Sequence, residues 1–355
     1  MSDIKICVVG GGNITISRHI PALLKENVDI IGAIGKDKSS LDLIKKKYKI
    51  KNIMNINENS DIEEQLKNSL WFVNDVDAVV CGLPPNEHYK MAMIFLKLNK
   101  HVLMEKPFTI TTDEANEIIK LSKEKKLVVN LVHNFQYADG MIKLENIIKN
   151  NELGDIKSVL EFQISNRFRR LPKWYNELPL GLFYDEASHF FYTIFKLFGD
   201  IKINNAFCVY NKDEKDKTPK IINSNMITEN EIPVTLYINF NSPICEWFFI
   251  VFGENKIAIY DFFKDILILI NNDNLHLGKN ILNTAISYFS QFWKWFFING
   301  FKYTFGKLLY GHNIVVKHFI KAIENNEEDF NISAQRGLQV VDAMNKIIQI
   351  ANKKQ

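Results

Sequence analysis

The sequence contains few cysteines, few arginines and no long apolar run. Its four cysteines are far apart and form no C-x-x-C pair, which excludes a disulfide framework and the usual zinc spacing. No uncharged apolar run reaches the ~20 residues that a membrane-spanning helix needs, and no basic segment followed by an apolar one marks a secretory signal. Since 44 Lys and Arg oppose 41 Asp and Glu, a nucleic-acid-binding chain is also excluded. We therefore expect a cytoplasmic protein with reduced, buried thiols.

Two patterns of secondary structure divide the 355 residues. In residues 1–135, short apolar runs alternate with amphipathic stretches of helical length, which predicts a doubly wound parallel sheet covered on both faces. In residues 136–355, apolar strands follow one another with few helical crossovers, which predicts an α+β domain with a largely antiparallel sheet. The predicted fold class is thus α/β with a second, α+β domain. The closing helix could pack back on the N-terminal domain.

A glycine triplet, Gly10–Gly12, directly follows the first predicted strand, Ile4–Val9, and opens the first helix. Glycine lets the backbone turn tightly and approach a pyrophosphate, whose charge then lies against free N–H groups at the helix N-terminus. A plain strand-to-helix turn has the same pattern, and Thr15 stands at the third fingerprint position. The predicted contacts to a dinucleotide are Gly10, Gly12, Asn13 and Ile14.

The end of the second predicted strand bears on the choice between NAD and NADP. NAD enzymes usually place a carboxylate there, but this chain has Gly35, followed by Lys36. Without that anion, Lys36 and the nearby Ser39 and Ser40 would suit a 2′-phosphate, so NADP is favoured over NAD. The alternative is that Lys36 is solvated and that Asp37 takes the acidic role.

The most distinctive motif is Glu105-Lys106-Pro107, which ends a predicted strand. Four further motifs accompany it along nearly the whole chain: the glycine turn leading to His19-Ile20-Pro21, the Pro84-Pro85-Asn86 loop, the stretch Gly181–His189, and the closing helix pair from Phe319. Together they resemble the glucose–fructose oxidoreductase/inositol dehydrogenase (Gfo/Idh/MocA) family. The resemblance implies an N-terminal Rossmann domain and a C-terminal domain whose open sheet often forms the oligomer interface. We therefore expect a homodimer or homotetramer.

The resemblance also implies a chemistry: hydride transfer between a nicotinamide and a secondary hydroxyl or keto carbon of a sugar or sugar nucleotide. The resemblance implies that Lys106 contacts the substrate and the nicotinamide ribose, and that Glu105 orients Lys106 or the nearby backbone. A surface lysine is the alternative in a chain with 39 lysines. We expect a cis peptide bond before Pro107. The cofactor contacts predicted in this region are Pro84, Asn86, His88, Glu105 and Lys106.

Asp185 and His189 form a second candidate pair. Residues four apart share one face of a helix, and a neutral imidazole beside a carboxylate can take an alcohol proton near neutral pH. The spacing matches the catalytic pair of the family, which makes His189 the base and Asp185 its orienting partner. A capping aspartate and a core histidine are the alternative. His133, at the end of the sixth strand, is a weaker candidate for substrate binding, and no metal site is predicted.

Three of the five arginines lie between positions 167 and 170. Arginine binds phosphate and carboxylate groups through two nitrogens, so the cluster predicts an anionic substrate group, such as a sugar-nucleotide diphosphate or a uronic acid. The candidate substrate contacts are Arg167, Arg169 and Trp174. The alternative is a solvated basic loop paired with Glu161 or Glu177.

Residues 288–310 are rich in aromatic side chains, which occupy 11 of the 23 positions. No acidic residue occurs between Asp273 and Glu324. A subunit interface or core packing, a lid over the cofactor, and peripheral membrane contact are the three interpretations. The last would fit an enzyme of glycolipid or surface-polysaccharide assembly.

Two functions from other classes stay open on the sequence alone. The first is a glycoside hydrolase of the same family, which keeps NAD bound and uses transient oxidation. The second is a non-catalytic nucleotide-binding or membrane-associated subunit.

Overall fold

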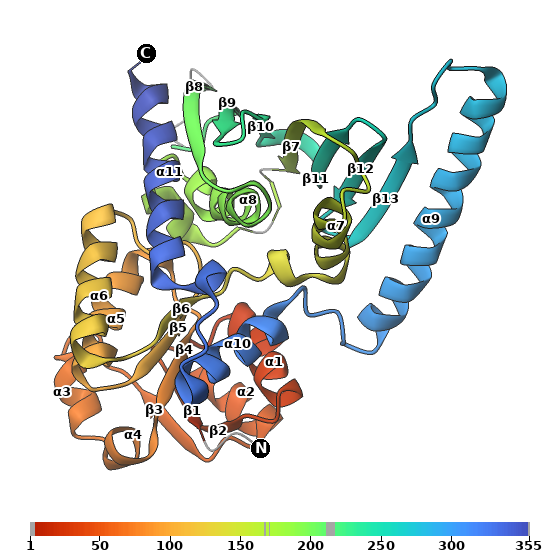
Figure 1. The fold of residues 1–355 in the computed structure, drawn as a ribbon. Coiled ribbons are helices and arrows are strands. Elements are labelled where there is room, and N and C mark those ends of the chain that lie inside the picture. The colour runs from red at the N-terminus through yellow and green to blue at the C-terminus, as the bar shows by residue number, and fades with distance from the viewer. Residues whose placement is uncertain (1–3, 167, 170, 211–216, 354–355) are drawn as a thin grey trace. The chain divides into compact units, whose positions relative to one another are not determined.

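The computed structural model describes residues 4–166, 168–169, 171–210 and 217–353, and these form two compact units (Figure 1). Unit 1 comprises the residues up to Asn134 together with His312–Asp342. Unit 2 comprises Phe135–Gly311 and the residues from Ala343 onward.

Unit 1 contains a six-stranded sheet in which all neighbouring strands are parallel, in the order β3-β2-β1-β4-β5-β6. Its strands are β1 Lys5–Val9, β2 Asp29–Gly35, β3 Asn52–Asn55, β4 Ala78–Cys81, β5 His101–Met104 and β6 Val129–Leu131. The central strands are buried apolar runs, as expected where helices cover both faces of a sheet. Figure 1 shows α5 and α6 on one side of the sheet and α1, α2 and α10 on the other. The predicted doubly wound parallel sheet is confirmed.

Most helical segments of unit 1 connect its strands, and the last three come from residues 312–342. The segments are η1 Thr15–His19, α1 Ile20–Lys25, α2 Lys38–Tyr48, α3 Ile62–Lys67, α4 Leu70–Asp75, α5 Pro85–Lys97, α6 Thr112–Lys125, α10 His312–Asn325, η4 Phe330–Ile332 and the first part of α11 Ala334–Asn352. The first predicted helix differs from the expectation, since its opening segment η1 is a π-helix that α1 continues.

Unit 2 contains a seven-stranded sheet in the order β13-β12-β11-β7-β10-β9-β8. Its strands are β7 Ile156–Asn166, β8 Ile201–Val209, β9 Ile221–Thr228, β10 Pro233–Asn239, β11 Asn241–Gly253, β12 Lys256–Asp261 and β13 Ile266–Asn271. Of its neighbouring pairs, β7 with β10 is parallel and the others are antiparallel. The largely antiparallel sheet predicted for the second domain is therefore confirmed.

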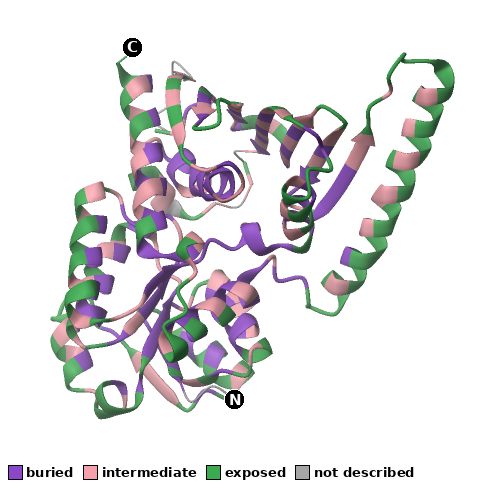
Figure 2. Ribbon diagram, viewed as in Figure 1, coloured by how far each residue is buried: buried purple, intermediate pink, exposed green. Residues whose placement is uncertain are grey.

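The helices of unit 2 differ greatly in burial. They are η2 Phe135–Tyr137, α7 Asp139–Lys149, η3 Lys173–Glu177, α8 Leu182–Phe198, α9 Gly278–Thr304 and the end of α11. Nearly all of α8 is buried, whereas Asn299 is the one buried residue of α9 (Figure 2). The interpretation of residues 288–310 as core packing is therefore wrong, because none of the 11 aromatic side chains there is buried.

Candidate functional site

The turn after β1 has the close backbone approach that a dinucleotide-binding site requires. Gly10 has φ +93°, and a Cβ there would lie 2.5 Å from the carbonyl oxygen of Gly82. A Cβ at Gly11 would lie 2.7 Å from the Cβ of Ser40, whereas a Cβ at Gly12 would meet no heavy atom within 4 Å. The first two glycines are therefore needed for packing, and the backbone at the third is open to an approaching pyrophosphate. The turn fits the cofactor predicted for it.

The departure from the glycine fingerprint at Thr15 has a structural explanation. Thr15 is fully buried, and a Cβ added to Gly82, just after β4, would lie 2.4 Å from its hydroxyl oxygen. In the usual fingerprint a third glycine lets the helix pack closely on the sheet. Here Gly82, at the end of the neighbouring strand, leaves room for the Thr15 side chain instead. Asn13 and Ile14, predicted to contact the cofactor, lie at the start of this helical segment, where the Asn13 carbonyl accepts a 2.7 Å hydrogen bond from the Ser17 hydroxyl.

The residues after β2 are held by local ion pairs and hydrogen bonds. The ammonium of Lys36 pairs with the carboxylates of Glu58 and Glu87, the latter at 2.7 Å. Burial alone would lower the pKa of Lys36, but the hydrogen bonds and charges of these two glutamates raise it. Asp37 accepts hydrogen bonds from both the backbone and the hydroxyls of Ser39 and Ser40, which lowers its pKa to about 2.

These contacts bear on the predicted binding of a 2′-phosphate near Gly35. The positive charge of Lys36 is already matched by two carboxylates, and the two serine hydroxyls already bond the ionised Asp37. Sequence analysis favoured NADP because Lys36 would supply a free positive charge for the 2′-phosphate. In the structure that charge is balanced by the two carboxylates.

The strand end after β5 is tied to the Pro84-Pro85-Asn86 loop by a buried histidine. The Lys106–Pro107 peptide bond is cis, as predicted, and Lys106 is half-buried. Nδ1 of His88 lies 2.8 Å from the carbonyl oxygen of Pro107, and its Nε2 lies 2.9 Å from that of Leu83. Burial lowers the pKa of His88. The lowered pKa favours a neutral ring, which carries a single N–H and so donates to only one of these two carbonyl oxygens at a time. The contact of His88 with the cofactor stays a prediction.

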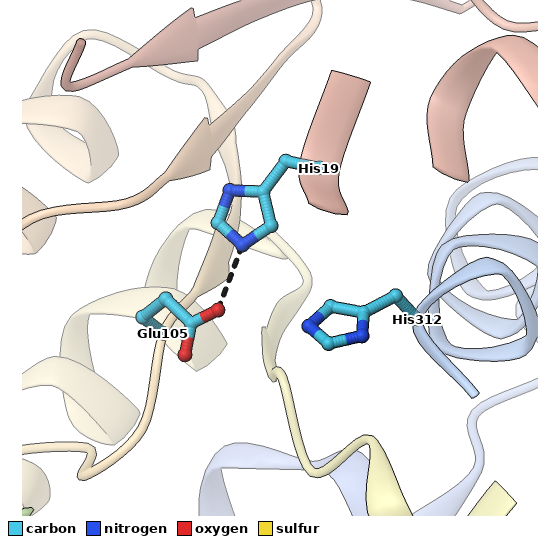
Figure 3. Close-up of side chains that lie close together, drawn as sticks. All are labelled: His19, Glu105 and His312. Carbon is cyan, nitrogen blue, oxygen red and sulfur yellow. Dashed lines mark hydrogen bonds and ion pairs between the residues drawn. The ribbon is translucent and has the colours of Figure 1, made fainter. Parts of the chain in front are cut away.

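Glu105 lies beside His19, and His312 lies near both, so three side chains from distant parts of unit 1 come together (Figure 3). Oε1 of Glu105 accepts a 2.7 Å hydrogen bond from Nε2 of His19 at the end of η1, and its Oε2 accepts a 3.1 Å bond from the backbone N–H of Lys106. Burial would raise the pKa of Glu105, but His19, His312 and Lys106 together lower it to about 2. The carboxylate is therefore ionised, and it fixes the backbone at Lys106.

The same three side chains form a possible set of metal ligands. One ligand atom from each of His19, Glu105 and His312 lies within 4.8 Å of the others, and two imidazoles with a carboxylate suit a divalent cation such as Zn²⁺. The hydrogen bond from His19 already gives the carboxylate a partner without a metal. The absence of a metal site thus stays a prediction. Sequence analysis did not connect His312 to this region, because no local pattern links residues so far apart.

His133, the weaker candidate for substrate binding, is buried after β6. Its Nδ1 lies 3.0 Å from the carbonyl oxygen of Asn331. Burial lowers the pKa of His133 to about 4, so the ring is neutral at physiological pH.

In unit 2, Asp185 and His189 both lie on α8, the first half-buried and the second buried. Nδ1 of His189 is 2.7 Å from the hydroxyl of Tyr192, which also accepts a 3.2 Å hydrogen bond from the N–H of Phe135. When Nδ1–H donates to this hydroxyl, Nε2 carries the lone pair that a base needs. Sequence analysis missed Tyr192, although its position three residues after His189 on one helix face was the available signal.

Aromatic rings surround the imidazole of His189. Phe135 meets it edge-on, with ring centroids 5.0 Å apart, and Trp247 lies 5.4 Å away. The indole nitrogen of Trp247 is buried without a hydrogen-bond partner among the described residues. The ring is therefore held in an apolar setting that limits its access to water.

The arginine-rich loop is attached to the same helix. Arg169 forms an ion pair with Glu186 of α8, and Trp174 is half-buried in η3. Glu161, one of the two acidic partners in the alternative interpretation, is fully buried on β7, and neither of its carboxyl oxygens has a hydrogen-bond partner among the described residues, so it does not pair with Arg169. Burial raises the pKa of Glu161 well above its usual value. Arg167 lies outside the described residues.

Comparison with known proteins finds relatives that are oxidoreductases. An uncharacterized oxidoreductase of Schizosaccharomyces pombe is 31% identical over 206 residues, which are 56% of this chain and 53% of that protein. The chain thus spans about half the length of this relative and of a second oxidoreductase from the same organism.

Two solved structures share the fold over nearly the whole chain. A dehydrogenase from Bordetella pertussis, in complex with NADH and UDP-GlcNAcA, has a TM-score of 0.76 and 14% identity, and the alignment covers 99% of this chain and 96% of that one. A mutant 3-ketoreductase from Actinomadura kijaniata, in complex with TDP-benzene and NADP, has a TM-score of 0.74 and 14% identity, with 98% of each chain covered.

Two family models match successive parts of the chain. Residues 4–133 match the oxidoreductase family with an NAD-binding Rossmann fold, and residues 146–355 match the C-terminal alpha/beta domain of the same family. This protein belongs to the Gfo/Idh/MocA family of oxidoreductases.

Proposed function

We propose that this protein transfers a hydride between a nicotinamide cofactor and a secondary hydroxyl or keto carbon of a sugar or sugar nucleotide. The observation that carries the proposal lies within unit 1. The open backbone at Gly12 and the Glu105-Lys106-Pro107 segment follow the carboxyl ends of β1 and β5, which flank β4 in one parallel sheet. Ligands of such sheets bind at the carboxyl ends of the strands.

We assign the cofactor contacts residue by residue. The glycine turn, Asn13 and Ile14 would hold the pyrophosphate, the residues after Gly35 the adenosine ribose, and Pro84, Asn86 and Lys106 the nicotinamide end. When bound, the nicotinamide supplies the hydride acceptor or donor. We propose that NAD and NADP both bind, and that NADP binding requires Lys36 to leave one of its two carboxylate partners.

Three side chains handle the proton of the substrate hydroxyl. His189 accepts it at Nε2, while the Tyr192 hydroxyl holds Nδ1 and the apolar rings around the imidazole exclude water. Asp185, one turn earlier on α8, stabilises by its negative charge the imidazolium that forms, and Lys106 stabilises the oxygen that loses the proton. In the reverse direction, the same nitrogen returns the proton to the carbonyl oxygen. We propose these roles by residue, from the family motifs.

A nucleotide sugar is the substrate class that we propose. The solved structures with UDP-GlcNAcA and TDP-benzene support it, since both bound molecules carry a diphosphate. In this chain Arg169, with Trp174 nearby in sequence, supplies a planar cation and an aromatic ring, which suit a diphosphate and a sugar or base. Nucleotide sugars are precursors of surface polysaccharides, and we propose that setting for the reaction.

The test is a turnover assay with NAD and NADP against a panel of UDP- and TDP-linked sugars, following nicotinamide reduction and the keto product. We expect reduction with at least one nucleotide sugar and its loss in Lys106→Ala. Glycoside cleavage without net reduced cofactor would instead support the hydrolase alternative. Cofactor binding without turnover of any sugar would contradict the proposal and support a non-catalytic subunit.

A further inference from the structure

Helix α9 presents its polar side chains to unit 2 and its apolar side chains to the outside. The partly covered positions recur every three or four residues, which is the spacing of one helix face. Six of the eight covered positions are polar, namely Asn280, Thr284, Ser287, Gln291, Asn299 and Lys302, and the other two are Phe292 and Trp295. An ordinary surface helix has the opposite arrangement, with its apolar stripe toward the core.

The polar face of α9 is fixed to unit 2 by specific contacts. The side-chain amide of Gln291 bonds both the N–H and the carbonyl oxygen of Leu269, at 3.0 and 2.9 Å, on the edge strand β13. Asn299 donates to the carbonyl oxygen of Lys264 at 2.9 Å, and Lys302 forms an ion pair with Asp139. These contacts hold one face of the helix inward along much of its length.

The remaining surface of α9 and its flanking turns is exposed, and most of its large side chains are apolar. Phe297 is 66% exposed and Tyr303 is 74% exposed. The other large apolar side chains exposed here are Leu275, Leu277, Ile281, Leu282, Ile286, Tyr288, Phe289, Trp293, Phe296, Ile298, Phe301 and Phe305. Figure 2 shows exposed residues along the whole length of α9. Soluble monomers rarely expose an apolar surface of this extent, so it marks a binding surface.

The charged side chains of α9 itself and of the turn after it are all basic, and one of them, Lys302, is paired with Asp139. The charged residues of α9 are Lys279, Lys294 and Lys302, and Lys307 follows the helix. No acidic residue occurs between Asp273 and Glu324. Basic residues beside exposed aromatic rings complement a bilayer that carries negative headgroups. We propose that α9 lies on the surface of an anionic membrane, with its aromatic face in the headgroup region.

The properties of the helix favour lying on a membrane over crossing one. With 27 residues, α9 is about 40 Å long, but among the described residues no helix is apolar enough throughout to cross a bilayer. A helix with one polar face bound to its own domain can insert only its other face. The proposal concerns where the protein binds, and it is independent of the redox function proposed above.

A second copy of the chain is a weaker candidate for the same surface. Two α9 helices that met through their apolar faces would bring lysines of both copies together. The 50 residues between Asp273 and Glu324 supply no acidic side chain to offset them. An anionic lipid surface supplies that charge.

Vesicle sedimentation of the full chain tests the proposal. We expect the protein to pellet with vesicles of phosphatidylcholine and phosphatidylglycerol at low salt, to pellet less with phosphatidylcholine alone, and to dissociate as salt rises. The variant Phe289→Ser/Phe297→Ser/Phe301→Ser should bind with a partition coefficient about tenfold lower for each phenylalanine removed. Lys294→Glu with Lys307→Glu should abolish the preference for phosphatidylglycerol.

A matched control and two further measurements separate the outcomes. The triple variant Leu24→Ser/Leu43→Ser/Leu70→Ser removes exposed leucines from unit 1 and should pellet like the original protein. Brominated lipids should quench the fluorescence of Trp293. Protein that stays in the supernatant with phosphatidylglycerol vesicles at low salt would overturn the proposal. Sedimentation velocity without lipid tests the alternative. A dimer that is lost in the phenylalanine variant, together with no binding to vesicles, would assign the surface to a second copy of the chain.

Discussion

Nε2 of His19 donates a 2.7 Å hydrogen bond to the carboxylate of Glu105, although the two residues are 86 positions apart in the sequence. The bond joins the helical segment after the glycine turn to the strand end that carries Lys106. Glu105 also accepts a bond from the backbone of Lys106, so a single buried carboxylate connects two motifs that we assign to the cofactor. The position of Lys106 therefore depends on the charge of Glu105.

The variant Glu105→Gln tests this dependence. It keeps the shape of the side chain but loses the charge, and we expect it to lower the free energy of unfolding by about 1–3 kcal/mol and to raise the KM for the cofactor. The pKa of Glu105 is lowered to about 2 in the folded protein. The ionised carboxylate therefore stabilises the fold above the pKa that Glu105 has in the unfolded chain, and this stabilisation is lost as pH falls toward 2. Thermal unfolding from pH 7 to pH 3 should show this loss in the original protein and a smaller one in the variant. Equal losses, or an unchanged KM, would contradict the account, and the exposed Glu124→Gln is the control.

The buried Glu161 should destabilise the protein at neutral pH. The pKa of Glu161 is raised in the folded state. The free energy of unfolding is therefore highest below the pKa that this carboxyl group has in the unfolded chain, and it falls as pH rises through the folded-state pKa. We expect Glu161→Met, which keeps the volume and removes the unbonded carboxyl group, to raise the free energy of unfolding at pH 7 by about 1–3 kcal/mol. Denaturant unfolding measures this, with the exposed Glu254→Met as control. A destabilised Glu161→Met protein would show that the carboxyl group has a binding partner.

The cofactor preference should respond to the partners of Lys36. Glu87→Gln removes one of the two carboxylates that hold its ammonium, which leaves more positive charge for a 2′-phosphate. We expect a several-fold lower Kd for NADP and little change for NAD, measured by titration of the nicotinamide cofactors. Lys36→Ala should raise the Kd for NADP, because it removes the ammonium group that would bind the 2′-phosphate. Equal effects on the two cofactors would place the 2′-phosphate away from Lys36.

Tyr192 is a positioning residue for His189 in our account. Tyr192→Phe removes the hydroxyl that bonds Nδ1 of His189, and we expect kcat to fall by about tenfold or more with little change in KM. A merely structural role would leave the pH profile unaltered, whereas loss of this bond should move its acidic limb. The control Tyr237→Phe, on β10, should leave the profile in place. An unmoved limb in Tyr192→Phe would remove Tyr192 from the mechanism.

The elements defined by local sequence could be predicted closely. Helix α6, Thr112–Lys125, is an example, because Thr111 and Glu114 form a capping box that defines its start from adjacent residues. Strand β9, Ile221–Thr228, is not evident from the sequence, since polar residues interrupt its apolar alternation and its register is set by pairing with neighbouring strands.

The contacts within the candidate site were much harder to predict. The motifs indicated Glu105 and His189 from the sequence, but not that His19 and Tyr192 would be their hydrogen-bond partners. The two glutamates that hold Lys36 come from a turn and from a helix far along the chain, so only tertiary folding brings them together. The sequence supplied candidate residues for the chemistry, whereas the folded structure determines their contacts and orientation.

The central claim is that Lys106 and His189 act in one proton-transfer step, and a double-mutant cycle tests it most directly. The kcat of the purified protein, Lys106→Ala, His189→Ala and the double variant would be compared with the best nucleotide sugar. We predict that each single variant loses at least about a hundredfold in kcat and that the double variant is hardly slower than the worse single one. Effects that multiply in the double variant, or a single variant with full turnover, would contradict the account.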